Sequence, residues 1–104
     1  MKKVQLVLSD LAVVDILEQA DWYQAKSGPS LAKRWDKAVT TAVLRTLRNP
    51  TSGKVCSFRA SELRDVRRLP IRGFPKHLIF YQVRGSKLVV LRVVHGARDL
   101  EVLF

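Results

Sequence analysis

Two histidines and a set of arginines are the residues of this chain whose side chains could carry out chemistry. His77 and His95 are the only histidines, and imidazole is the side chain whose charge changes most readily near pH 7. Each has a structural alternative, because His95 could end a strand with a satisfied hydrogen bond and His77 could be solvated beside Lys76. These structural roles are the commoner ones for a lone histidine, so neither side chain alone indicates catalysis.

The single cysteine does not add a reactive site. No histidine or acid lies at a recognisable spacing from Cys56, so a thiol used for packing is the better interpretation. One thiol also cannot form an internal disulfide. We expect no metal ion and no cofactor.

The chain carries a large excess of positive charge. Among its 104 residues, 19 are Lys or Arg and nine are Asp or Glu, which gives a net charge of +10. Around the apolar C-terminal segments the basic residues are Arg64, Arg67, Arg68, Arg72, Lys76, Arg84, Lys87, Arg92 and Arg98. This clustering indicates an anionic partner, either a nucleic acid or an acidic protein and less often a membrane surface. The alternative is that the charge serves only solubility.

The N-terminal half predicts one strand and two helices that position these residues. Residues 2–8 alternate in polarity and predict a short strand, after which Ser9 suits a helix N-cap. The apolar stripe of the first helix would consist of Val13, Ile16, Leu17, Ala20 and Tyr23. A break at Gly28 and Pro29 separates it from a second helix that ends near Asn49. Helices that are joined by so short a connection pack beside each other, so the two helices should form an antiparallel hairpin.

The C-terminal half predicts three strands after a loop at 51–62, to which we assign no chemistry. The first strand, at 64–69, has basic residues on both faces and suits a sheet edge or an exposed rim. The other two, at 78–83 and 88–94, are apolar on both faces and are joined by a turn that begins at Gly85. Strict alternation in the last strand sets Val89, Leu91 and Val93 against Leu88, Val90 and Val94.

These elements indicate an α+β fold in a single domain, 1–104. Two helices can cover one face of the sheet, so part of the second face should be a groove that a partner fills, unless the loop and the C-terminal tail close it. The first residues are too short and polar for a secretory signal, and no apolar run approaches the roughly 20 residues of a membrane span. We therefore expect a cytoplasmic protein that does not bind membranes.

Three segments of the chain carry a resemblance to a known family. The runs RRLPIRGFPKHLIFYQV at 67–83 and LRVVHGARDL at 91–100 resemble the C-terminal half of the ParE branch of the RelE/ParE toxins. The run ADWYQAKSGPSLAKRW at 20–35 is similar to the helix-turn-helix segment of that family. The resemblance implies the order strand, two helices and three strands. It also implies a plasmid or bacterial toxin of a type II toxin–antitoxin pair, held inactive by an acidic antitoxin that wraps its groove.

Two activities occur among proteins that resemble this chain. RelE-like members cleave messenger RNA on the ribosome with basic residues and a late Tyr or His-Tyr pair, whereas ParE-like members act on DNA gyrase. Metal-free RNA cleavage needs a proton acceptor and cations that stabilise charge on the phosphate. Here Leu78 stands where related ribonucleases often place an Arg, and no Tyr follows His95. These departures favour a gyrase-binding toxin without catalytic residues over the ribonuclease.

The resemblance and the charge pattern together predict three sets of site residues. Candidates for binding the target are Arg67, Arg68, Arg72, His95, Arg98 and Asp99. Candidates for binding the antitoxin, which could be ParD-like or of another kind, are Leu78, Phe80, Val90, Arg92 and Val94. If the protein is instead a ribonuclease, the catalytic set would be His77, His95, Arg68 and Arg98. A third possibility is an inactive homologue that retains only antitoxin binding.

Overall fold

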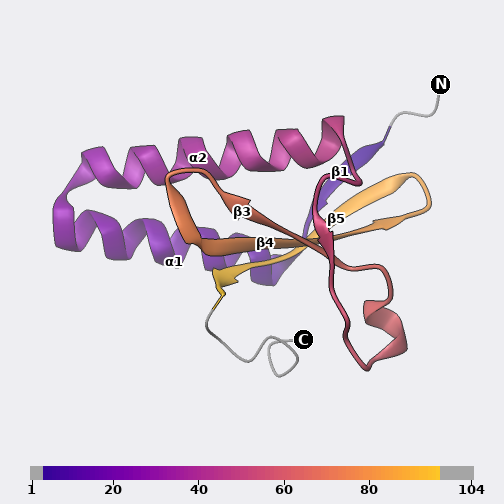
Figure 1. The fold of residues 1–104 in the computed structure, drawn as a ribbon. Helices are drawn as coiled ribbons and strands as arrows, with labels where there is room; N and C mark the ends of the chain where they lie inside the picture. The colour runs from indigo at the N-terminus through magenta and orange to yellow at the C-terminus, as the bar shows by residue number, and fades with distance from the viewer. Residues whose placement is uncertain (1–3, 97–104) are drawn as a thin grey trace.

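The computed structural model describes residues 4–96, so the proposed site residues Arg98 and Asp99 lie outside the described part. Its elements are β1 (Gln5–Leu8), α1 (Asp10–Ser27), α2 (Pro29–Arg48), β2 (Lys54–Val55), the 3-10 helix η1 (Ser61–Leu63), β3 (Arg67–Ile71), β4 (Phe74–Arg84) and β5 (Lys87–His95). The helices lie side by side as a hairpin along one face of the sheet (Figure 1). The predicted α+β fold is confirmed.

The sheet contains five strands in the order β1-β5-β4-β3-β2. β3, β4 and β5 form the predicted antiparallel sheet, and β2 adds a two-residue antiparallel pair beside β3. The N-terminal strand β1 pairs with β5 in parallel, from Gln5 opposite Lys87 to Leu8 opposite Val90. The first and last strands of the described chain are therefore neighbours.

Local sequence signals set the ends of both helices as predicted. The Ser9 hydroxyl accepts the Ala12 backbone N–H at 3.0 Å and caps α1. Gly28, with φ of 86°, separates the helices, and Pro29 is the first residue of α2. Neither helix of the described part is long and apolar enough to cross a membrane.

The buried side of α1 differs from the predicted stripe. Ala12 is fully buried, and Ile16 and Tyr23 pack against the core. The prediction is wrong for Val13 and Leu17, which are 39% and 58% exposed. Apolar residues occur on most sides of this helix, so their spacing does not determine which side faces the sheet.

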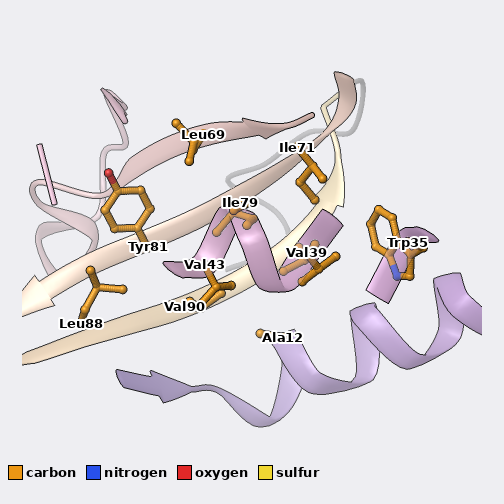
Figure 2. Packing of buried hydrophobic residues seen from close by; sticks show 12 residues of the cluster. Ala12, Trp35, Val39, Val43, Leu69, Ile71, Ile79, Tyr81, Leu88 and Val90 are labelled. Atoms are coloured by element: carbon orange, nitrogen blue, oxygen red, sulfur yellow. The ribbon is translucent and has the colours of Figure 1, made fainter. Parts of the chain in front are cut away.

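The main core lies between the helices and the sheet (Figure 2). Trp35 is completely buried there, and its indole N–H donates to the Ile16 carbonyl oxygen at 3.0 Å, which ties α2 to α1. Its partners in the core include Val39 and Val43 from α2 and Ile71, Ile79, Tyr81, Leu88 and Val90 from the strands. This core holds both helices against β3, β4 and β5. It therefore determines which side of α2 is exposed.

The second face of the sheet is covered by the segment between β2 and β3. Leu63 and Val66 of this segment pack on Phe80 and Val94 as a second core cluster, and Phe58 contacts Phe80 with ring centroids 6.4 Å apart. Thus the predicted groove is closed here by the loop. β3 also begins at Arg67 rather than at residue 64, because η1 and the positive φ of Asp65, 61°, occupy the preceding residues.

A β-bulge in β5 changes which residues face the helices. Phe80 pairs with Arg92 and Tyr81 pairs with Val90, so Leu91 is an extra residue in β5. As a result Val93 belongs to the main core and Val94 to the second-face cluster. The predicted alternation is therefore correct for Leu91 and wrong for Val93 and Val94, which lie on the faces opposite to those predicted.

Candidate functional site

The two histidines lie opposite each other on neighbouring strands. His77 of β4 and His95 of β5 are Cα partners, and their ring centroids are 5.5 Å apart. The His77 ring also packs edge-on against the rings of Trp35 and Tyr23, with centroid distances of 5.0 Å and 6.4 Å, on the face of the sheet that the helices cover. The pair lines a pocket of about 630 Å³ with Asp15, Glu18, Gln19, Trp22, Tyr23, Val93 and Val94.

Burial lowers the pKa of His77, and the nearby His95 lowers it further. In the unfolded chain a histidine titrates at about pH 6.5, whereas His77 in the folded protein has a lower pKa. At a pH between the pKa of the folded state and that of the unfolded state, the unfolded chain binds more protons than the folded protein. The free energy of unfolding must therefore decrease as the pH falls through this range.

We expect urea unfolding to show lower stability at about pH 5.5 than at about pH 7.5, and His77→Gln to show a smaller decrease. Carboxylates contribute equally to both proteins, so the difference between the two pH profiles isolates His77. Equal decreases in the wild-type protein and the variant would contradict this interpretation.

Arg68 does not approach the histidine pair. Arg68 is the Cα partner of Phe80, so its side chain is on the second face of the sheet. It lies close enough to Cys56 to lower the pKa of that thiol, although burial has the larger effect and raises it. The candidate ribonuclease residues in the described part are thus divided between opposite faces, and they do not converge on one phosphate.

Arg67 has a structural contact. Its Nη1 donates to the backbone oxygens of Gly53 at 2.8 Å and Thr51 at 3.3 Å. The Tyr81 hydroxyl, on the strand beside it, accepts the Gly53 N–H at 2.9 Å and donates to the Pro50 oxygen at 2.8 Å. Arg67 therefore holds the connection that follows α2, and it shares no face with Arg68.

The five residues proposed to bind the antitoxin do not form a free surface. Val90 is in the main core, which corrects its assignment, and Phe80 and Val94 are buried under the β2–β3 segment. Leu78 is partly buried beside them. A partner could reach these side chains only by displacing that segment.

Arg92, the fifth of these residues, forms an ion pair with Asp15 of α1. Its Nε and Nη2 donate to the two Asp15 carboxylate oxygens, each at 2.8 Å, and both side chains are about nine-tenths buried, at 12% and 11% exposure. The Val93 N–H donates to the same carboxylate at 3.0 Å. These hydrogen bonds raise the pKa of Arg92. The carboxylate thus holds α1 on the edge of β5, beyond the end of β1.

A basic groove runs along the exposed side of α2, where the sequence alone predicted no site. It has a volume of about 790 Å³ and is bounded on its other side by the β3–β4 turn. Its lining residues are Leu31, Arg34, Lys37, Ala38, Thr41, Ala42, Arg45, Arg48, Asn49, Ser52, Pro70, Arg72, Gly73 and Phe74. We call this the α2 groove. Of the proposed target-binding residues, Arg72 lies in it.

The signal for the α2 groove is present in the sequence as the spacing of the cations. Arg34, Lys37, Arg45 and Arg48 share one side of α2, but cations on an exposed helix face are usually only solvated. Among residues 4–96 no three His, Cys, Asp or Glu side chains come together to hold a metal ion.

A comparison with protein families identifies the chain. The family model described as "ParE toxin of type II toxin-antitoxin system, parDE" matches residues 6–100. The chain belongs to the ParE toxin family. The RelE/ParE resemblance is thereby confirmed, and the protein is a toxin component of a type II toxin–antitoxin system.

The structure of this ParE toxin is also similar to a solved structure described as "Chromosomal ParDE TA system from P. aeruginosa". The TM-score is 0.75 at 18% sequence identity, over 91% of this chain and 98% of the other. At this identity the likeness supports the fold alone. No protein with curated function matches the chain.

Proposed function

We propose that this ParE toxin acts in the cytoplasm, as a single domain, by binding DNA gyrase, and that an acidic antitoxin neutralises it. The observation that carries the proposal is the separation of Arg68 from the histidine pair on opposite faces of the sheet. A metal-free ribonuclease needs its base and its cations around one phosphate. A toxin that acts by binding needs only a complementary surface.

The proposed target-binding residues differ in how freely their side chains could reach a partner. Arg72 is exposed beside the α2 groove, and Arg68 and His95 are partly exposed. Arg67 is the weakest candidate because its guanidinium is engaged with Thr51 and Gly53. Arg98 and Asp99 remain candidates from the family resemblance.

We expect the purified toxin to inhibit supercoiling by gyrase, or to trap cleaved DNA, and not to cleave ribosome-bound message. His95→Ala should weaken the inhibition modestly, as loss of one contact does, and not by the roughly 100-fold or more expected when a general base is removed. The measurements are the supercoiling assay and primer extension on translated message.

The alternative activities give different results in the same assays. Codon-specific cuts that disappear in His95→Ala or His77→Ala would overturn the gyrase assignment and support the ribonuclease. No effect of the folded protein in either assay, together with retained antitoxin binding, would support the inactive homologue.

A further inference from the structure

We propose that copies of this chain associate head to tail, with the exposed side of α1 from one copy seated in the α2 groove of the next copy. The contact joins identical chains, so it is independent of the target on which the toxin acts. It follows from the charge and the spacing of two different surfaces on the same molecule.

The first surface is a row of residues along the exposed side of α1. Asp10, Val14, Leu17 and Asp21 follow one another at steps of four, three and four residues, which is the spacing of side chains on one side of a helix. All four residues are exposed, and Val14 and Leu17 are 45% and 58% exposed. We call these four residues the α1 stripe. It has an acid at each end and two apolar side chains between the acids.

The acids of the chain are concentrated in α1. Four of the nine Asp and Glu residues lie in this helix, although the net charge of the chain is +10. An acidic and apolar surface of this kind attracts a basic and apolar partner. The protein itself carries such a surface on its other helix.

The second surface is the α2 groove. Its four cations on α2 are exposed and form two pairs along the helix, Arg34 with Lys37 and Arg45 with Arg48. Among the described residues, the groove lining contains no Asp or Glu. The part of the lining that α2 contributes between the pairs has short side chains, namely Ala38, Thr41 and Ala42. The groove therefore has a cation pair toward each end and room between the pairs for larger side chains of a partner.

The charges of the two surfaces have the same spacing. Asp10 and Asp21 are eleven residues apart in one helix, which corresponds to about 16 Å along its axis. The midpoints of the two cation pairs are also about eleven residues, or about 16 Å, apart. Each acid can therefore lie beside one cation pair while Val14 and Leu17 lie over the short side chains between the pairs. This arrangement would remove the apolar surface of both side chains from water.

The same charges disfavour a symmetric contact. Two α1 stripes facing each other would bring acids together in either orientation, and two α2 grooves facing each other would bring cations together. One copy cannot fill its own groove, because α1 and α2 lie side by side and the groove is bounded by α2 and the β3–β4 turn (Figure 1). The contact therefore joins different surfaces of two copies. Contacts of this kind repeat into open chains or close into rings.

Sedimentation equilibrium of the purified, nuclease-treated toxin over a range of protein concentrations tests the association. We expect the average mass to increase with concentration beyond the mass of two chains, because every added copy leaves one surface free. A mass of one chain at every concentration would overturn the inference.

Two variants each remove one surface. The stripe variant Val14→Ser/Leu17→Ser lacks the apolar side chains of the α1 stripe, and the groove variant Arg34→Glu/Arg45→Glu reverses one cation of each pair. Each variant alone should associate at least about tenfold more weakly than the wild type. A mixture of the two should form a 1:1 dimer and nothing larger. The intact stripe of the groove variant fits the intact groove of the stripe variant, whereas the other two surfaces are defective.

Matched controls leave both surfaces unchanged. Val55→Ser/Val83→Ser removes two exposed apolar side chains from strands, and Lys76→Glu/Lys87→Glu reverses two exposed charges outside the groove lining. Each control should change the association less than about threefold. Circular dichroism shows whether each variant is folded.

Three further results would overturn the inference. A mixture of the stripe and groove variants that stays monomeric would show that the wild-type contact is symmetric or uses other surfaces. Equal weakening by the charge control would show dependence on net charge alone, and association that disappears on nuclease treatment would show bridging by nucleic acid. If the groove variant does not fold, Lys37→Glu/Arg48→Glu reverses the other cation of each pair and takes its place in the mixture.

Discussion

Replacing Asp15 by alanine is expected to lower the free energy of unfolding by about 3–5 kcal/mol. The substitution leaves the Arg92 guanidinium, about nine-tenths buried, without the carboxylate that accepts two of its hydrogen bonds. It also removes the acceptor for the Val93 N–H. Urea unfolding followed by circular dichroism measures the loss.

The double variant Asp15→Ala/Arg92→Met separates the two contributions. Removing the arginine as well removes the buried charge that has lost the Asp15 carboxylate, so the double variant should be more stable than Asp15→Ala alone. It should remain less stable than the wild type, because an unpaired buried Val93 N–H costs about 1–3 kcal/mol. A loss below about 1 kcal/mol in Asp15→Ala would show that the ion pair behaves as an exposed one.

The second large effect is expected at Gly53, where a methyl group has no room. A Cβ at this position would lie 2.6 Å from the Tyr81 hydroxyl oxygen and 2.9 Å from the Arg68 backbone oxygen. The backbone oxygen cannot move away easily, and displacement of Tyr81 would break its hydrogen bonds to Gly53 and Pro50. We expect Gly53→Ala to cost about 2–4 kcal/mol of stability.

Gly85→Ala is the control for this substitution. Gly85 has a positive φ of 60° in the β4–β5 turn, but a Cβ there meets no atom within 4 Å. Its cost should be the backbone strain alone, about 1 kcal/mol. A denaturation midpoint for Gly53→Ala equal to that of the wild type would mean that the connection after α2 adjusts freely.

The sequence predicted best the features that depend on local signals. Ser9, Gly28 and Pro29 act on the residues next to them, so the helix ends follow from the sequence. The side of α1 that is buried depends instead on which of several apolar faces fits the sheet. For this reason Val13 and Leu17 are exposed although their spacing is helical.

The site was harder to predict because it depends on contacts between distant segments. The bulge at Leu91 changes which face of the sheet the following residues occupy, so that Val93 lies in the main core. No residue type in the sequence indicates such an insertion. The α2 groove exists because the β3–β4 turn lies opposite the cations of α2. Their spacing is visible in the sequence, but the opposite wall of the groove is not.

The parallel pairing of β1 with β5 has a consequence for the timing of folding. The hydroxyl of Ser9, the residue after β1, donates to the Leu91 backbone oxygen across 82 residues of chain, so β1 leaves the ribosome before its partner β5 and must wait for it. At about 5–20 residues per second, that interval is about 4–16 s. Closing so long a loop also slows folding, since distant contacts are made only after their entropy cost is met. A nascent chain that lacks β5 has neither a partner for β1 nor Leu88 and Val90 for its core. We therefore expect the toxin to become active only after β5 has been synthesised.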